Sequence, residues 1–243
     1  MPKISLDDDI LLFTDGASKG NPGPGGYGAI LAFPEGRIKE LGEGFNRVTN
    51  NQMELLAIIE GLNEISDIKG PVAVLTDSTY AIQGITQWIH GWRRNDWKTA
   101  AGKPVSNKDY WQQLYKLVEN RAEAISWHYV RGHTGIPGNE RADEIGSELA
   151  LQNHVSLYDG MLTSYDHPIH DIPEDTSLPD RSQKKARASK KAAYSYLSLI
   201  GNDLQIHKTW KECEARVKGR SGARFKKALS AADEDAIKKS WGV

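Results

Sequence analysis

The sequence has very little cysteine and no long hydrophobic run. Cys213 is the single cysteine among 243 residues, so an internal disulfide and a zinc site built from several cysteines are both excluded. No stretch approaches the roughly 18 to 20 apolar residues that cross a bilayer, and the opening MPKISLDDD has no apolar core of a signal peptide. We therefore expect a cytoplasmic protein with no membrane partner.

Lysine and arginine are missing from residues 151–180, and this gap separates parts of the chain that differ in charge. The whole chain has a formal net charge of −1. Residues 1–150 have a net charge of −5, residues 151–180 of −6 and residues 181–243 of +10. The basic end favours a polyanionic partner, although a solvated basic tail would have the same composition.

Short apolar runs alternate with helical periodicities over the first 150 residues, which predicts an α/β fold with a mixed sheet and flanking helices. Residues 21–28, rich in glycine and proline, are expected to form a turn. Thr49 or Asn50 is expected to cap a helix. Strands are expected at residues 10–14, 27–33, 37–45, 72–75 and 124–130, and helices at residues 50–65, 79–87, 109–121 and 139–151.

The pattern divides the chain into three parts. Residues 1–152 are expected to form one domain, and residues 153–189, which change abruptly from acidic to basic, a flexible linker. Residues 190–243 regain aromatic side chains and are expected to form a small α+β domain, close to the lower size limit for independent folding.

Two aspartates end apolar strands in similar contexts, Asp15 in LFTDG and Asp77 in VLTDS. If these strands pair in parallel, the two carboxylates lie about 5 Å apart at the carboxyl edge of the sheet, where such folds bind ligands. Glu54 lies on the helical stripe that should face the sheet. Each residue taken alone also fits a turn or cap aspartate, or a glutamate in the first turn of a helix.

Converging carboxylates repel one another unless a cation lies between them. Oxygen ligands without a Cys or His cluster favour Mg²⁺, with Mn²⁺ as a substitute. Two such ions about 4 Å apart activate a water and stabilise a leaving oxygen in phosphodiester cleavage.

Four segments occur in one order: TDGASKGNPGPGGYGAI, TNNQMELLA, LTDSTYAIQGI and VRGHTGIPGNERAD. Over residues 9–150 the chain resembles the type 1 ribonuclease H family. The resemblance implies a five-stranded mixed sheet and Mg²⁺-dependent endonucleolytic cleavage of the RNA strand of RNA/DNA hybrids, leaving 5′-phosphate and 3′-hydroxyl ends. It also implies two ions held by Asp15, Glu54, Asp77 and Asp143, and a loop histidine, His133, that assists proton transfer or product release.

The resemblance also implies substrate contacts. Three asparagines match positions that read the RNA side of the minor groove: Asn21, Asn50 and Asn51. Three residues match a pocket for a DNA-strand phosphate: Arg47, Thr49 and Asn107. Tryptophans and basic residues alternate over residues 88–111, a segment that resembles a basic protrusion; here we expect Trp88 to line the DNA channel and Trp92, Trp97 and Trp111 to pack the helices.

The C-terminal part resembles the hybrid-binding, viroplasmin-type domain. The matching residues are Tyr196, Trp210, Phe225, Lys226 and Lys227. In that family the aromatic residues face the DNA strand and the lysines face phosphates. The alternative for Trp210 and Phe225 is a place in the core of this small domain.

These observations predict an enzyme that binds RNA/DNA hybrids and acts as a monomer. Two alternatives stay open: a non-catalytic protein that binds hybrids or double-stranded RNA, and a different nuclease of the same fold. A protein partner for the C-terminal unit also stays open.

Overall fold

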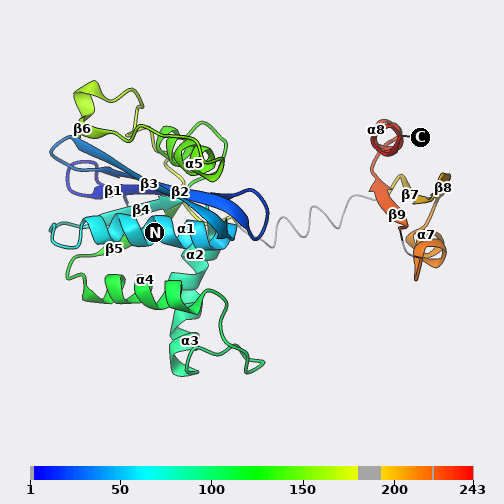
Figure 1. The fold of residues 1–243 in the computed structure, drawn as a ribbon, viewed down its shortest axis with the longest axis horizontal. Helices are drawn as coiled ribbons and strands as arrows, with labels where there is room; N and C mark the ends of the chain where they lie inside the picture. The colour runs from blue at the N-terminus through cyan, green and yellow to red at the C-terminus, as the bar shows by residue number, and fades with distance from the viewer. Residues whose placement is uncertain (1–2, 180–192, 221, 243) are drawn as a thin grey trace. The chain divides into compact units, whose positions relative to one another are not determined.

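The computed structural model describes residues 3–179, 193–220 and 222–242. The chain forms two compact units, Met1–Leu178 and Pro179–Val243. Their coloured ribbons are shown in Figure 1. Within the described ranges, no helix is both long and apolar enough to span a membrane.

The first unit is a mixed sheet between two layers of helix, as the sequence predicts. The strand order is β5-β4-β1-β2-β3-β6, with β1 antiparallel to β2 and parallel to β4. Helices α1 and α4 cover one face and α5 covers the other (Figure 1). The strands are β1 (Ile10–Ser18), β2 (Gly23–Ala32), β3 (Arg37–Val48), β4 (Val72–Thr76), β5 (Ile125–Tyr129) and β6 (Asp159–Met161), and these helices are α1 (Asn50–Glu64), α4 (Lys108–Asn120) and α5 (Pro137–Ala150).

The expected turn at residues 21–28 is wrong, because β2 already begins at Gly23. Glycines in this strand allow α5 to approach the sheet closely. A Cβ atom on Gly28 would lie 2.2 Å from the carbonyl oxygen of Ala142 in α5. These glycines therefore lie in a strand and permit close packing of a helix, and they do not form a turn. Composition alone does not distinguish these two roles of glycine.

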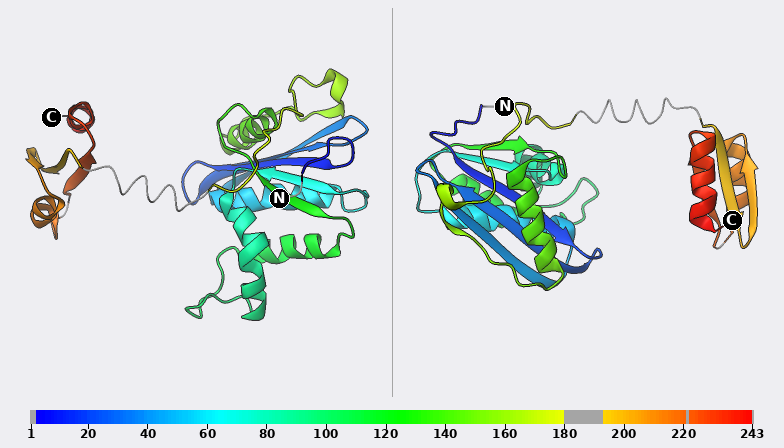
Figure 2. Two further views of the ribbon diagram at one scale, coloured as in Figure 1. Left: turned by 180° about the vertical axis from the view of Figure 1, so that it is seen from behind. Right: turned by 90° about the horizontal axis from the view of Figure 1, so that it is seen from above.

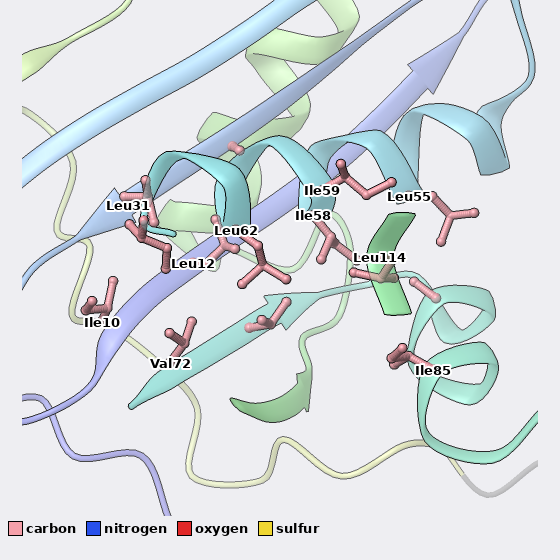
Figure 3. Packing of buried hydrophobic residues seen from close by; sticks show 14 of the residues in the cluster. Ile10, Leu12, Leu31, Leu55, Ile58, Ile59, Leu62, Val72, Ile85 and Leu114 are labelled. Atoms are coloured by element: carbon pink, nitrogen blue, oxygen red, sulfur yellow. The ribbon is translucent and has the colours of Figure 1, made fainter. Parts of the chain in front are cut away.

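Helix α1 begins at Asn50 because Thr49 caps it. The Thr49 side chain accepts a hydrogen bond from the Gln52 backbone N–H, and the Gln52 side chain accepts one from the Thr49 N–H, which forms a capping box. The buried face of α1 then packs on the sheet with Leu55, Ile58 and Leu62 (Figure 3). This packing holds the start of α1 against the carboxyl end of β1.

The helix expected after β4 is longer than predicted and is interrupted. It consists of α2 (Thr79–Gln83), the π-helical turn η1 (Gly84–Trp88) and α3 (Ile89–Arg94). A Cβ atom on Gly84 would lie 2.0 Å from the Trp111 ring, so a glycine is needed where this helix meets α4. The α3 end projects away from the sheet (Figure 1).

The expected domain boundary at residue 152 is wrong, because residues 153–178, here called the strap, belong to the first unit. The strap adds β6 antiparallel to β3, so the sheet has six strands instead of the expected five. At the opposite edge of the sheet, the Tyr129 N–H donates to the Thr176 carbonyl oxygen at 2.8 Å. Between these points a 3₁₀ turn, η2 (Leu162–Ser164), is followed by Ile169, which is 1% exposed.

The strap was missed because its buried residues follow no helical or strand periodicity over a long window. From residue 180 onward, the rest of the expected linker lies outside the described residues until residue 193.

The second unit is a small α+β domain, as expected. An antiparallel sheet has the order β8-β7-β9, with two helices on it (Figure 2). Its small core contains Leu197, Ala228 and Ile237. Its elements are β7 (Ser195–Ile200), β8 (Asp203–His207), α7 (Trp210–Val217), β9 (Arg224–Ala228) and α8 (Ala231–Trp241).

Candidate active site

Asp15 and Asp77 each come directly after the last residue pair between two neighbouring parallel strands, β1 and β4. Thr14 of β1 lies opposite Thr76 of β4 in a parallel pair, so the condition on which the sequence brings the two carboxylates together is met. The backbone N–H of Gly16 donates to the Asp15 carboxylate at 2.6 Å. The strand register thus brings both carboxylates to one edge of the sheet.

Glu54 reaches this edge from the first turns of α1. A Cβ atom on Gly16 would lie 2.2 Å from the Glu54 backbone nitrogen, so the end of β1 touches the helix backbone. The Glu54 carboxylate accepts a hydrogen bond from Asn50 at 2.9 Å and another from the Ser78 hydroxyl. Ser78 is a site residue that sequence analysis missed; its position directly after Asp77 was the available signal.

The fourth carboxylate, Asp143, lies in α5 beside His133. The His133 Nδ1 atom is 3.4 Å from an Asp143 carboxylate oxygen, and the imidazole is 81% exposed. His133 itself has a left-handed backbone, with φ of 54°. A Cβ atom on Gly132 would lie 2.2 Å from an Asp77 carboxylate oxygen, so the loop that carries His133 packs against Asp77. Four elements (β1, α1, β4 and α5) and the loop that carries His133 therefore converge here.

The electrostatics show that these carboxylates are close enough to influence one another. Burial is the main cause that raises the pKa of Asp15 to about 8, and the Asp77 and Asp143 carboxylates add to it. Burial also raises the pKa of Glu54, partly offset by its hydrogen bond from the Ser78 side chain. Burial raises the pKa of Asp77, while the nearby His133 lowers it. A site of this kind favours a bound cation.

The chemistry of this donor set fits a hard divalent cation. Its ligands are carboxylate oxygens, which Mg²⁺ and Mn²⁺ prefer. Within the described part of the chain, no group of three or more His, Cys, Asp and Glu side chains could hold a metal ion as it stands.

The residues predicted to read the hybrid differ in exposure and in the contacts that they make. Asn21 is exposed in the turn between β1 and β2, and Asn51 is exposed in the first turn of α1. Asn50 is engaged with Glu54. Arg47 is exposed at the end of β3, whereas Thr49 caps α1 and is half-buried.

Trp92, Trp97 and Trp111 pack the helices as predicted, whereas the place of Trp88 in a DNA channel stays a prediction. Trp111 is fully buried, and Trp92 and Trp97 pack against the main core. Trp88 is half-buried, with its ring centroid 5.9 Å from that of Tyr80. Tyr80 also contacts Asn107, which is predicted to bind a DNA-strand phosphate. The side-chain amide of Asn107 donates a hydrogen bond to the Tyr80 hydroxyl at 3.2 Å.

The second unit presents an aromatic row on its surface. The ring centroid of Trp210 lies 5.8 Å from that of Tyr196 and 5.4 Å from that of Phe225. Trp210 is 40% exposed and Phe225 is 52% exposed, so neither is a core residue of the unit. Lys226 and Lys227 follow on β9, where alternate residues face opposite sides of the sheet. Lys227 therefore shares the face of Phe225 and Tyr196, and Lys226 lies on the other face.

Comparisons with known proteins agree with this geometry. The RNase H family pattern matches residues 7–150, and the ribonuclease H1 N-terminal domain pattern matches residues 200–233. A ribonuclease H from Acidovorax sp. (strain JS42) is 50% identical over 144 residues, which are 58% of this chain and 94% of the relative. A ribonuclease H from Maricaulis maris (strain MCS10) is 51% identical over 139 residues, 57% of this chain and 91% of the relative.

A solved structure also matches the first unit. The crystal structure of LC9-RNase H1, a type 1 RNase H with the type 2 active-site motif, is 26% identical and has a TM-score of 0.55. The match covers 74% of this chain and 95% of that chain. With the pattern matched over more than half of its length, the chain belongs to the ribonuclease H family.

Proposed function

We propose that this protein hydrolyses the RNA strand of RNA/DNA hybrids endonucleolytically, with two Mg²⁺ ions held by Asp15, Glu54, Asp77 and Asp143. The observation that carries the proposal is the convergence of four mutually interacting carboxylates at the carboxyl ends of β1 and β4. The ribonuclease H relatives support the choice of substrate.

The ions, when bound, supply an activated water and stabilise the leaving oxygen, which gives 5′-phosphate and 3′-hydroxyl ends. The chain's own residues orient and move protons. Ser78 and Asn50 hold the Glu54 carboxylate from two sides, which limits its rotation. His133 is exposed on a glycine-flanked loop next to Asp143, where its imidazole accepts a proton or assists product release.

Discrimination of RNA from DNA requires contacts to the 2′-hydroxyl in the wide minor groove. Amide side chains both donate and accept hydrogen bonds, which suits this hydroxyl. Asn21, Asn50 and Asn51 would make these contacts, while Arg47, Thr49 and Asn107 would bind a DNA-strand phosphate. Trp88 would line the channel for the DNA strand.

The second unit would add affinity rather than catalysis. Its row of Tyr196, Trp210 and Phe225 suits stacking on sugars or bases. Of the two lysines matched to phosphate contacts, Lys227 would supply one beside this row, and Lys226, on the other face of β9, would contribute less. The match of residues 200–233 to the ribonuclease H1 N-terminal domain supports this role.

The test is cleavage of an end-labelled RNA/DNA hybrid by the full chain, with Mg²⁺ and with a chelator, beside a DNA duplex and an RNA duplex of the same sequence. We expect cleavage of the hybrid's RNA strand only, and only with Mg²⁺. Asp77→Asn should lower turnover by orders of magnitude and retain a folded far-ultraviolet circular dichroism spectrum. Ser156→Ala, with a side chain outside the site, serves as the control. Near-normal turnover of Asp77→Asn would overturn the site assignment.

Mn²⁺ should replace Mg²⁺ in the same assay. The cytoplasmic location and monomeric state expected from the sequence are part of this proposal, and cell fractionation and size-exclusion chromatography with light scattering test them.

A further inference from the structure

A carboxylate outside the active site is buried in the first unit with all of its acceptor capacity used. Glu40 of β3 has a side chain that is 1% exposed. Its Oε1 atom accepts from Arg141 Nε at 2.8 Å and from the Tyr165 hydroxyl at 2.7 Å. Its Oε2 atom accepts from Arg141 Nη2 at 3.0 Å and from the Tyr158 N–H at 2.9 Å. A carboxylate with four donors is held in one orientation.

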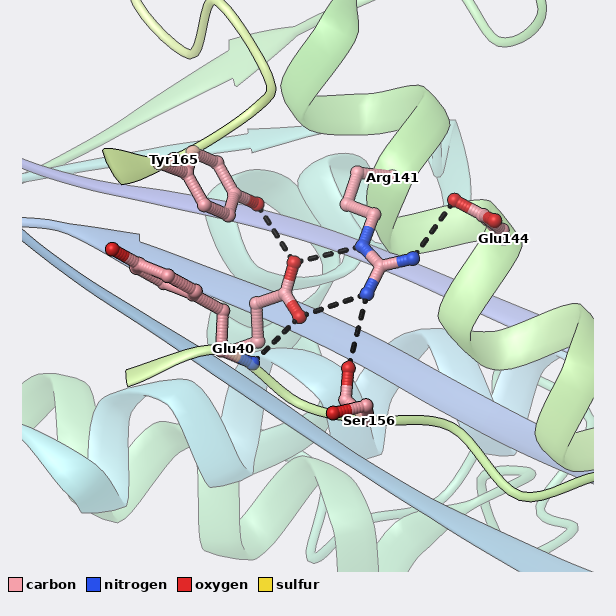
Figure 4. A network of polar contacts seen from close by, with 6 residues as sticks. Glu40, Arg141, Glu144, Ser156 and Tyr165 are labelled. Carbon is pink, nitrogen blue, oxygen red and sulfur yellow. Dashed lines mark hydrogen bonds and ion pairs between the residues drawn. The ribbon is translucent and has the colours of Figure 1, made fainter. Parts of the chain in front are cut away.

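Arg141 extends this arrangement to three separate parts of the fold (Figure 4). Its guanidinium pairs with Glu40 in the sheet and donates to the Ser156 carbonyl oxygen in the strap at 3.3 Å. It also binds Glu144 in its own helix, α5, at 2.9 Å. We call Glu40, Arg141 and Tyr165 the node, because they join β3, α5 and the strap.

The node lies on the helix that carries an active-site carboxylate. Arg141 precedes Asp143 by two residues, which places them about 200° apart around the helix axis. Arg141 therefore acts on Asp143 only through the placement of the helix.

A further polar contact at the start of α5 is local: the Glu140 carboxylate accepts from the Gly135 N–H at 2.7 Å, which joins the helix to its own preceding loop and not to the sheet. Ile136, at the N-cap position, makes no side-chain cap hydrogen bond. The face of α5 on the sheet packs closely: a Cβ atom on Gly28 would lie 2.2 Å from the Ala142 carbonyl oxygen, and one on Gly138 would lie 2.6 Å from the Phe13 ring. This apolar packing sets how near the helix lies to the sheet. The bidentate, buried pair between Arg141 and Glu40 adds a directional contact between this helix and β3, because a planar guanidinium fits a carboxylate in one orientation.

We infer that the node positions Asp143 for metal binding, so that Arg141, Glu40 and Tyr165 are positioning residues of the active site. The strap is then part of the catalytic apparatus, because it supplies the Tyr165 hydroxyl and the Tyr158 N–H that complete the Glu40 shell. This inference rests on the proposed Mg²⁺-dependent function.

The test uses the full chain and two matched arginine substitutions. Arg141→Lys keeps the charge and removes the bidentate geometry. Arg37→Lys is the control, because Arg37 also joins β3 to the strap, through Asp159 at 3.0 Å, without touching α5. Mg²⁺ binding is measured by isothermal titration calorimetry, and hybrid cleavage is measured as a function of Mg²⁺ concentration.

For Arg141→Lys we expect the Mg²⁺ dissociation constant to rise about tenfold, at the lower end of the range for residues that support metal ligands. At low Mg²⁺, kcat should fall with an unchanged KM for the hybrid, and high Mg²⁺ should restore it. Arg37→Lys should bind Mg²⁺ like the wild type. Tyr165→Phe, which removes one hydroxyl, should shift the Mg²⁺ curve in the same direction by less, and it carries the test if Arg141→Lys fails to fold.

Three results would overturn the inference. Folded Arg141→Lys and Tyr165→Phe with wild-type Mg²⁺ affinity would show that the node is only structural. An equal shift in Arg37→Lys would show a general loosening of the sheet edge. A wild-type protein that neither binds Mg²⁺ nor cleaves hybrid would overturn the proposed function as well, which distinguishes the two failures.

Discussion

At the scale of single residues, burial divides the carboxylates of the first unit into two kinds. Asp15 is buried among other acids, and its pKa rises to about 8. Glu40 is also buried, which by itself raises its pKa, but the hydrogen bonds from Arg141, the Tyr158 N–H and the Tyr165 hydroxyl, together with the charge of Arg141, outweigh that burial and lower the pKa. The first kind favours a cation from solution, whereas the second is already neutralised by the chain.

The first prediction concerns Asp15 and pH in the absence of metal. The carboxyl titrates near pH 3.8 when unfolded and near pH 8 when folded, so its contribution to stability decreases as pH rises between these values. Asp15→Asn should therefore stabilise the metal-free protein by roughly 2 kcal/mol at pH 8 and by little at pH 4. The value at pH 8 is set below the upper limit of about 1.36 kcal/mol for each unit of pKa shift. Urea unfolding with a chelator measures this. An equal gain at both pH values would contradict the prediction.

The second prediction concerns His133. Its imidazole is 81% exposed at the surface beside Asp143, so its loss should not disturb packing. His133→Ala should lower kcat about 10- to 1000-fold with little change in hybrid affinity. Single-turnover cleavage and a separate equilibrium binding measurement in Ca²⁺ distinguish the two quantities. A large loss of affinity with normal turnover would make His133 a substrate contact instead.

At the scale of elements, strand alternation decides which neighbouring residues act together. Lys226 and Lys227 are adjacent in sequence and would both be assigned to phosphate contacts on that basis. In β9 they face opposite sides, and only Lys227 shares a face with the aromatic row.

The third prediction follows from this alternation. Lys227→Ala should weaken hybrid binding and flatten the dependence of log K on log salt by about 1, whereas Lys226→Ala should change both quantities less. Fluorescence anisotropy with a labelled hybrid at several salt concentrations measures both variants. Equal effects would show that both side chains reach the strand despite the register.

At the scale of the whole molecule, the first unit ends after the strap and not after its last helix. The strap crosses from β3 to β5 and buries Ile169 and part of Tyr165 on the α5 face. The relatives reported above cover 57–58% of this chain, so the strap and the second unit lie largely beyond those matches.

The fourth prediction compares two shortened chains. A chain of residues 1–178 keeps the strap and should unfold with nearly the stability of the first unit in the full protein. A chain of residues 1–152 loses the buried Ile169 and half of the donors to Glu40, so it should be less stable by about 3 kcal/mol or more. Thermal and urea unfolding test this. Equal stabilities would mean that the strap adds no net stabilisation.

The tertiary structure decided the parallel pairing of β1 and β4 that brings Asp15 and Asp77 together. The sequence by itself determined the α/β class, the position of both aspartates directly after apolar runs, and the start of α1 at a capping residue. Each depends on local periodicity or on nearby turn and cap residues, which a linear pattern contains. Only the tertiary structure showed that residues 23–28 form a strand, because their glycines allow close packing of helix α5, which is distant in sequence. It alone placed the strap and the Glu40–Arg141 pair, because partners 101 residues apart leave no local signal.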